Sequence, residues 1–226
     1  MSRVPRGRLV VFEGGEGAGK TTQLRRLAAA LAAAGVPHRL YREPGGTTLG
    51  DRVRDLLLHQ DLPVAPRAEA ALFIASRAQL VAQELRPALE RGEHVLLDRF
   101  LLSTYAYQAY GRGLPLDEVR AANALATAGL VPDLTVLLAI EPVDGLKRVF
   151  QRGSADRIEQ ADDGFHGRVA DAFRTFADPA WQARHPECGP IVAVDASGRE
   201  DEVQARLRSV LAERLPALSP SAAGAR

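Results

Sequence analysis

The chain has 226 residues, of which 46% are hydrophobic and 25% are charged, as is ordinary for a folded globular protein. A formal net charge of +1 gives no overall electrostatic case for binding nucleic acid or an anionic membrane. The single cysteine, Cys188, excludes an intrachain disulfide, and no apolar run reaches the length of a membrane span. We therefore expect a cytoplasmic protein with no nucleic-acid or membrane partner.

The hydrophobic pattern predicts strands that alternate with helices along a single domain covering 1–226. In chain order, strands are expected at about 9–12, 38–41, 94–98, 134–140 and 191–194, and helices at about 20–34, 49–59, 67–91, 103–109, 116–128, 143–151, 165–177 and 200–215. A bend near Pro87, a mobile flap at 152–164 and a disordered tail at 219–226 are also expected. This alternation is typical of a three-layer α/β fold with a parallel sheet flanked by helices.

A glycine-rich segment joins the first predicted strand to the first predicted helix. It reads G-x-x-x-x-G-K-[ST], and its candidate phosphate-binding residues are Gly14, Gly15, Glu16, Gly17, Ala18, Gly19, Lys20, Thr21 and Thr22. Glycines allow backbone N–H groups to surround a phosphate, and the helix N-terminus adds positive potential. The segment predicts a nucleoside triphosphate site, with Lys20 on the terminal phosphates and Thr21 as a ligand of Mg²⁺.

Asp98 ends the third predicted strand and is the second candidate for Mg²⁺ binding. A switch GTPase would carry the same two elements, so that alternative must be weighed. Such proteins read guanine with Asn-Lys-x-Asp, whereas the only asparagine here is Asn123, in Ala-Asn-Ala. A sequence similar to the switch motif, at 195–198, follows the fifth strand, which is the wrong place, so a regulatory switch is disfavoured.

Arginines along the middle of the chain suggest a second, phosphorylated substrate. Arg54, Arg77 and Arg99 are all expected near the carboxyl edge of the sheet, and guanidinium groups suit phosphate recognition. Phe73 lies four residues before Arg77 on one helical face, where it could stack on a base. From the residues alone, Phe73 could equally be a core residue and each arginine a surface residue.

Five motifs resemble those of the thymidylate kinases, the enzymes that phosphorylate dTMP with ATP. They are Phe-Glu-Gly-Gly-Glu-Gly-Ala-Gly-Lys-Thr-Thr-Gln at 12–23, Arg-Glu-Pro-Gly-Gly-Thr at 42–47, Leu-Phe-Ile-Ala-Ser-Arg-Ala-Gln at 72–79, Asp-Arg-Phe-Leu-Leu-Ser-Thr-Tyr-Ala-Tyr-Gln at 98–108 and Arg-Gly-Ser-Ala-Asp-Arg-Ile-Glu at 152–159. The resemblance implies a P-loop NTPase fold of the nucleoside monophosphate kinase type, and a homodimer. It also implies phosphorylation of dTMP to dTDP in dTTP biosynthesis.

The resemblance also implies roles for individual residues. The acceptor pocket would be formed by Glu16, Glu43, Pro44, Arg54, Phe73, Arg77, Arg99, Ser103, Thr104, Tyr107 and Gln108. Within it, Phe73 would stack on thymine, Arg77 would read its edge, and Tyr107 would disfavour a 2′-hydroxyl. Arg148 would pack against adenine.

The catalytic residues would be Lys20, Arg99 and two lid arginines, Arg152 and Arg157, as in the bacterial arrangement. The chain departs from common relatives at Ala109, Tyr110 and Ala139. Two alternatives stay open: a kinase for another nucleoside monophosphate, and an ATP-dependent regulatory module.

Overall fold

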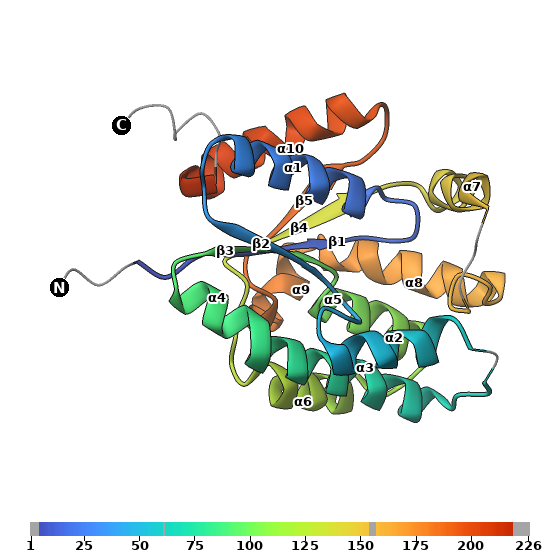
Figure 1. The fold of residues 1–226 in the computed structure, drawn as a ribbon. Helices are drawn as coiled ribbons and strands as arrows, with labels where there is room; N and C mark the ends of the chain where they lie inside the picture. The colour runs from blue at the N-terminus through green and yellow to red at the C-terminus, as the bar shows by residue number, and fades with distance from the viewer. Residues whose placement is uncertain (1–4, 61, 154–156, 219–226) are drawn as a thin grey trace.

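The computed structural model describes residues 5–60, 62–153 and 157–218, apart from the side chains of Phe150 and Arg152. Its centre is a parallel sheet in the order β2-β3-β1-β4-β5 (Figure 1). The strands are β1 (Leu9–Glu13), β2 (His38–Arg42), β3 (His94–Asp98), β4 (Leu134–Ala139) and β5 (Ile191–Asp195). In register, Val11 of the central strand lies beside Leu97 and Thr135. The predicted five-stranded parallel sheet is therefore confirmed.

Helices cover both faces of the sheet. They are α1 (Lys20–Ala33), α2 (Thr48–Leu58), α3 (Pro66–Leu80), α4 (Arg86–Glu90), α5 (Leu101–Thr104), α6 (Leu116–Thr127), α7 (Pro142–Arg152), α8 (Asp163–Phe176), α9 (Pro179–Arg184) and α10 (Glu200–Arg214). Two π-helical segments, at Val81–Leu85 and Tyr105–Gly111, continue α3 into α4 and extend α5. Short 3₁₀ turns occupy Pro186–Cys188 and Pro216–Leu218.

The alternation of side chains along β1 separates two hydrophobic cores. Val10 and Phe12 share one core with α1 and α10, which lie together on one side of the sheet in Figure 1. Leu9 and Val11 belong to the other core, built with helices α2 to α6, α8 and α9. All five side chains of β1 are buried, as expected for a strand covered on both faces. Because the strands are parallel, their carboxyl ends meet at one edge, where such folds place their ligands.

Several element boundaries differ from the sequence predictions. The helix expected at 67–91 contains a π-helical turn just before Pro87, whose missing N–H interrupts the ordinary bonding pattern. Helix α8 begins inside the expected flap because the side chain of Asp162 accepts a hydrogen bond from Phe165 N at 2.9 Å. The short helix α9 was not predicted. The expected tail at 219–226 lies outside the described residues.

Within the described part of the chain, the helices are all too short or too polar to span a bilayer.

Candidate active site

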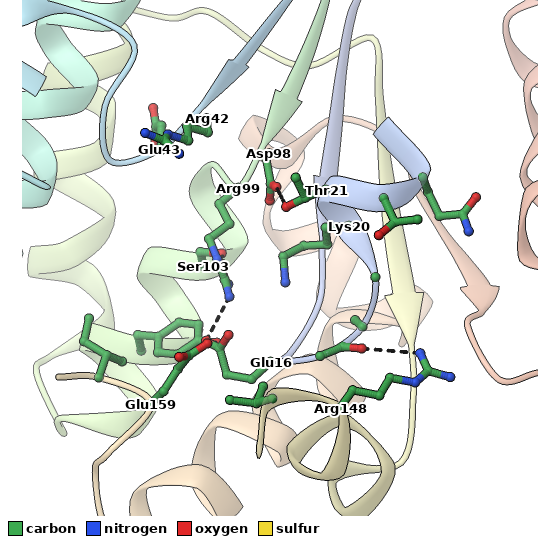
Figure 2. A pocket seen from close by; sticks show the side chains of 18 of the residues that line it. Glu16, Lys20, Thr21, Arg42, Glu43, Asp98, Arg99, Ser103, Arg148 and Glu159 are labelled. Carbon is green, nitrogen blue, oxygen red and sulfur yellow. Dashed lines mark hydrogen bonds and ion pairs between the residues drawn. The ribbon is translucent and has the colours of Figure 1, made fainter. Parts of the chain in front are cut away.

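A cavity of about 790 Å³ opens at the carboxyl edge of the sheet. Its walls come from the loop before α1, the ends of β2 and β3, helices α2, α3 and α7, and the start of α10. Figure 2 shows Lys20, Thr21 and Arg148 on one side of this space and Arg99, Ser103 and Glu159 on the other. Most of the residues predicted for a donor site and for an acceptor site therefore line one continuous cavity.

The loop from Gly14 to Gly19 is shaped by backbone conformations that suit glycine. Gly14, Gly17 and Gly19 have φ angles of 142°, 67° and 84°. Gly17 also packs so closely on α7 that a Cβ there would lie 2.0 Å from the carbonyl oxygen of Gly145. The loop is thus held by the main chain of a neighbouring helix, and a side chain at Gly17 would displace it.

Lys20 is buried at the start of α1 and reaches back over the loop. Its Nζ donates hydrogen bonds to the carbonyl oxygens of Gly14 at 2.9 Å and Gly15 at 2.8 Å. Burial, followed by the positive charge of Arg99, lowers the pKa of Lys20 to about 8, although Glu16 acts in the opposite direction. Because this pKa lies only slightly above neutral pH, Lys20 is mostly protonated at neutral pH and loses its charge when the pH rises a little.

Thr21 and Asp98 form the candidate metal site. The Thr21 hydroxyl donates to Asp98 Oδ2 at 2.6 Å, which joins the start of α1 to the end of β3 (Figure 2). Magnesium prefers hard oxygen ligands, commonly one or two from protein with the rest from water and phosphates. This hydroxyl–carboxylate pair fits that requirement. Among the described residues no group of three or more acidic, histidine or cysteine side chains forms a self-sufficient metal cage.

Arg99 follows Asp98 directly and turns its side chain the other way, toward the acceptor half of the cavity. Its φ of 69° places it in the left-handed region, which is uncommon for a non-glycine residue. The guanidinium donates to Glu16 Oε1 at 2.8 Å and to Ser103 Oγ at 3.1 Å. One strand end therefore delivers a carboxylate to the metal site and a cation to the middle of the cavity.

Glu16 is the partner of that cation and remains ionised. Burial opposes ionisation, but the nearby charges of Arg99 and Lys20 and the hydroxyl of Tyr107 outweigh it and lower the pKa of Glu16 to about 2. The Tyr107 hydroxyl donates to Glu16 Oε1 at 2.5 Å. The loop carboxylate is thus fixed by two residues of the predicted acceptor side.

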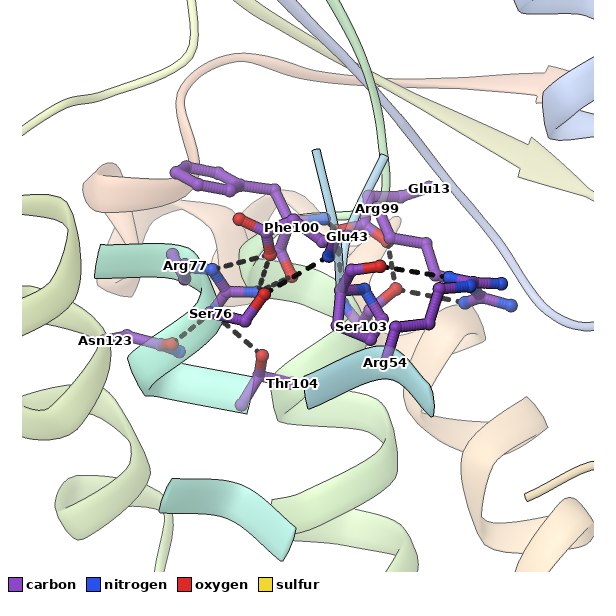
Figure 3. Close-up of polar contacts among 12 residues, drawn as sticks. Glu13, Glu43, Arg54, Ser76, Arg77, Arg99, Phe100, Ser103, Thr104 and Asn123 are labelled. Carbon is purple, nitrogen blue, oxygen red and sulfur yellow. Dashed lines mark hydrogen bonds and ion pairs between the residues drawn. The ribbon is translucent and has the colours of Figure 1, made fainter. Parts of the chain in front are cut away.

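Arg77 lies at the base of the acceptor half and is 1% exposed. It makes five hydrogen bonds: two to Glu43 and one each to Thr104 Oγ1, Asn123 and the Phe100 carbonyl (Figure 3). Its Nε donates to Glu43 Oε2 at 2.8 Å and its Nη2 to Phe100 O at 2.7 Å. All five N–H groups therefore have protein acceptors, so reading a base edge would require exchanging one of these bonds.

Glu43, the partner of Arg77, is buried beside the cavity. Burial raises the pKa of this carboxyl, while Arg77 acts in the opposite direction. Its Oε1 is buried with no hydrogen-bond partner among the described residues. The Glu43–Pro44 peptide bond is cis, and the Pro44 carbonyl accepts from Arg54 Nη1 at 3.1 Å.

The remaining acceptor residues also line the cavity. They are Phe73, Ser103, Thr104, Tyr107 and Gln108, from α3, α5 and the π-helical segment that follows α5. The structure brings these predicted residues together with Arg54 and Arg99, while Arg77 sits deeper within a network of side chains. Their contacts with a substrate stay predictions.

The three arginines expected near ATP or in the lid have different surroundings. Arg148 Nη1 donates to the carbonyls of Gly17 and Ala196, both at 3.3 Å, beside the phosphate loop (Figure 2). Arg157 Nη2 instead donates to Glu69 Oε2 at 2.7 Å, on the acceptor side. The side chain of Arg152 lies outside the described residues.

Two buried carboxylates were missed by the sequence analysis. Glu13, at the end of β1, accepts from Phe100 N at 2.8 Å, Ser103 N at 3.1 Å and Ser103 Oγ at 2.6 Å. It caps α5 directly from the residue before the phosphate loop. Glu69 accepts four hydrogen bonds from three side chains. An acidic residue ending an apolar strand could have indicated Glu13, whereas Glu69 resembles any surface glutamate in the first turn of a helix.

Together, the loop, Lys20 and the Thr21–Asp98 pair place the protein among the P-loop nucleotide-binding proteins. Comparison with known proteins identifies the group within that class. The family model described as thymidylate kinase matches residues 12–205. The chain therefore belongs to the thymidylate kinase family and is a phosphotransferase, which confirms the resemblance seen in its motifs.

Individual relatives agree with this assignment. The chain is 49% identical over 208 residues to a thymidylate kinase of Deinococcus radiodurans, covering 92% of this chain and 98% of the relative. It is 47% identical to one from Synechococcus sp. strain JA-2-3B'a(2-13), covering 92% and 95%. It is also 47% identical to one from Carboxydothermus hydrogenoformans, covering 76% and 85%.

Proposed function

We propose that this protein transfers the γ-phosphoryl group of ATP to dTMP, giving ADP and dTDP for dTTP biosynthesis. The observation that carries the proposal is a single cavity that joins the phosphate loop to the arginine-lined pocket, with Arg99 between them. The identity of the acceptor, dTMP, is inferred from the names of the relatives. The triphosphate site is inferred from the loop and Lys20. Two substrates bound in one cavity can react directly, without a covalent enzyme intermediate.

The chemistry proposed is an in-line displacement. An oxygen of the acceptor phosphate attacks the γ-phosphorus of ATP, and the bond from that phosphorus to the β–γ bridging oxygen breaks as ADP leaves. A phosphate dianion is already nucleophilic, so the chain need not provide a general base. The protein instead positions the two substrates and neutralises their negative charge: Lys20 stabilises the terminal phosphates, and Arg99 stabilises the group in transfer.

Thr21 and Asp98 would hold Mg²⁺ at the donor end of the cavity. A bound magnesium ion would neutralise phosphate charge and help to orient ATP. The backbone N–H groups of residues 14–22 would surround the phosphates, and Arg148 would lie against adenine.

On the acceptor side, Phe73 would stack on thymine, and Ser103, Thr104 and Gln108 would surround its edge. Arg54 and Arg99 would bind the acceptor phosphate, and Glu16 the sugar hydroxyl. Tyr107 would disfavour ribose. The position of Arg157 against Glu69 supports a role for Arg157 on the acceptor side, so Arg152 is our stronger candidate for the lid arginine that closes over the phosphates.

We also infer a homodimer and a cytoplasmic site of action. The resemblance of the motifs to the family implies a dimer, and the single cysteine of the chain suits a reducing compartment. Equilibrium sedimentation at micromolar concentration would reveal a monomer if the dimer inference is wrong.

The decisive experiment is a coupled assay of ADP release with dTMP, dUMP, UMP, CMP, AMP or GMP as acceptor. We expect dTMP to be preferred and dUMP to be a weaker substrate, because the thymine methyl contributes only about 1–3 kcal/mol to selectivity. Preference for another monophosphate would replace the proposal with a different kinase. Hydrolysis of ATP that ignores every acceptor would favour the regulatory module.

A further inference from the structure

Glu69, in the first turn of α3, is a buried carboxylate with no role in the reaction described so far. It is 1% exposed and accepts hydrogen bonds from two arginines and one amide. Oε1 accepts from Gln108 Nε2 and Arg112 Nε, both at 3.1 Å. Oε2 accepts from Arg112 Nη2 at 3.1 Å and Arg157 Nη2 at 2.7 Å. These donors come from distant parts of the chain that meet beside the cavity.

The charge of Glu69 follows from these partners. Burial alone would raise its pKa, but the hydrogen bonds from Arg112, Arg157 and Gln108 outweigh burial and lower it. The carboxylate is therefore ionised at neutral pH and can only accept hydrogen bonds.

An acceptor-only partner determines the orientation of the Gln108 amide. Its NH₂ group must face Glu69, which leaves its carbonyl oxygen as the amide atom that can accept a hydrogen bond from a ligand. Gln108 is also a wall residue of the cavity. An amide oxygen there suits a base that presents an N–H on its pairing edge, as thymine and uracil do at N3, and not cytosine, whose N3 is an acceptor.

The other partner, Arg157, connects Glu69 to the segment between α7 and α8. Arg157 Nε donates to the Leu57 carbonyl at 2.8 Å, and its backbone N–H donates to the Leu58 carbonyl at 3.3 Å. These contacts satisfy carbonyls in the last turn of α2, which have no partner within the helix. The two residues that follow, Ile158 and Glu159, line the cavity. The contacts that hold Arg157 in place therefore also fix the position of the part of the cavity wall that follows it.

We propose that Glu69 is a positioning residue: its buried carboxylate orients Gln108 toward the acceptor base and anchors the Arg157–Glu159 segment to the same cavity. The kinetic part of this inference rests on the dTMP kinase activity proposed above. The anchoring part concerns the chain alone and can be tested without turnover.

The first test compares Glu69→Gln with Glu118→Gln, a matched change on α6 at an exposed ion pair with Arg67. In Glu69→Gln the Gln108 amide can turn over, so we expect the KM for dTMP to rise by about two- to tenfold, the scale of one hydrogen bond between neutral groups. The KM for ATP should change by less than about twofold, since the loop contacts are untouched. The inhibition constant of dCMP, measured against dTMP, should fall relative to the KM for dTMP. Glu69→Asp, which keeps the charge, should recover part of the loss.

The second test follows cleavage by trypsin after Arg157, identified by mass spectrometry of the fragments. Cleavage at this bond should be at least about tenfold faster in Glu69→Gln than in the unaltered chain and in Glu118→Gln, because release of the segment exposes it. KM values for dTMP and ATP that rise together, or an unchanged rate of cleavage after Arg157, would overturn the proposal. Absence of dTMP kinase activity in the unaltered chain would instead refute the proposed function, and the tryptic measurement would still decide the anchoring.

Discussion

The two halves of the cavity are constructed in different ways. The donor half depends on one continuous segment, in which the backbone of residues 14–19 packs on α7 and Lys20 folds back over its own loop. The acceptor half depends on side chains far apart in sequence, such as Arg77 with Glu43 and Arg157 with Glu69. The first takes most of its shape from one local segment, which contacts with α7 and Asp98 hold in place. The second is formed by side chains that meet only once the whole chain has folded.

This difference has a physical consequence for mutation. In the donor half, a substitution at one of the loop glycines should act mainly on nucleotide binding, because it removes no charged partner. In the acceptor half, removing one member of a buried ion pair leaves an uncompensated charge and should act on folding as well. Arg99, which contacts both halves, should affect catalysis most of all.

The largest effect is expected at this junction. Arg99→Ala should lower kcat by about a thousandfold or more, on the scale of other arginines that stabilise a phosphoryl group in transfer. Rapid-quench measurement of the phosphoryl transfer step would check this value. Arg26→Ala, at an exposed ion pair with Glu200, provides the control and should leave kcat unchanged. Near-normal turnover in Arg99→Ala would remove Arg99 from the mechanism.

The next prediction tests the acceptor half by its stability. Arg77→Ala leaves Glu43 buried without its cation, so the free energy of unfolding should fall by about 3–5 kcal/mol. Urea denaturation followed by circular dichroism would measure it. The matched change Arg67→Ala, at a solvent-exposed pair with Glu118, should lower the free energy of unfolding far less, because water screens exposed ion pairs. Equal losses in the two variants would mean that the buried network is no more important than a surface contact.

The donor half can be tested by adding a single carbon. Gly17→Ala places a Cβ against the Gly145 carbonyl in a backbone conformation that disfavours a side chain, so the KM for ATP should rise about tenfold or more. In Gly15→Ala the added carbon meets nothing within 4 Å, and the loss should be clearly smaller. Isothermal titration with a non-hydrolysable ATP analogue would measure the loss of nucleotide affinity in each of the two variants. If both variants lose the same affinity, contact with α7 does not shape the loop.

The smallest effect is a dependence on pH. Burial and the charge of Arg99 lower the pKa of Lys20 to about 8, so its ammonium is lost as the pH rises through that value. The kcat/KM for ATP, which reports the free enzyme, should therefore fall above about pH 8 by up to tenfold per pH unit. At saturating ATP the fall in kcat should move to higher pH, because bound phosphates favour the charged lysine. A kcat/KM profile flat to pH 10 would contradict the perturbed lysine.

The same contrast explains what could be read from the sequence. The strands, the phosphate loop and Asp98 were predicted because each is a short continuous pattern with a local physical cause. The burial of Arg77 and its bonds to Glu43, 34 residues away, and Asn123, 46 residues away, leave no such pattern. A buried arginine on a helix has the same spacing as one in solvent, and only the assembled fold distinguishes them.

Glu69 and Arg157 show a second kind of contact that a sequence motif cannot predict. The lid motif at 152–159 identified Arg157 as a candidate for the phosphates, because its neighbours in sequence resemble those of the family. Its contacts with Glu69 and with the end of α2 depend on where the chain returns after β4, which a linear motif does not encode. Helix α9 was missed for a simpler reason: its six residues are too few to show a helical period.

The carboxylate of Glu13 has a consequence for anyone who wishes to engineer this fold. It belongs to the strand that leads into the phosphate loop, yet it caps the helix that carries Ser103. This one side chain therefore ties the start of α5, on the acceptor side, to the strand that leads into the phosphate loop. A chimera that imports a loop from another nucleotide-binding protein would need to bring this glutamate along, or the two substrates would be held at the wrong separation for transfer.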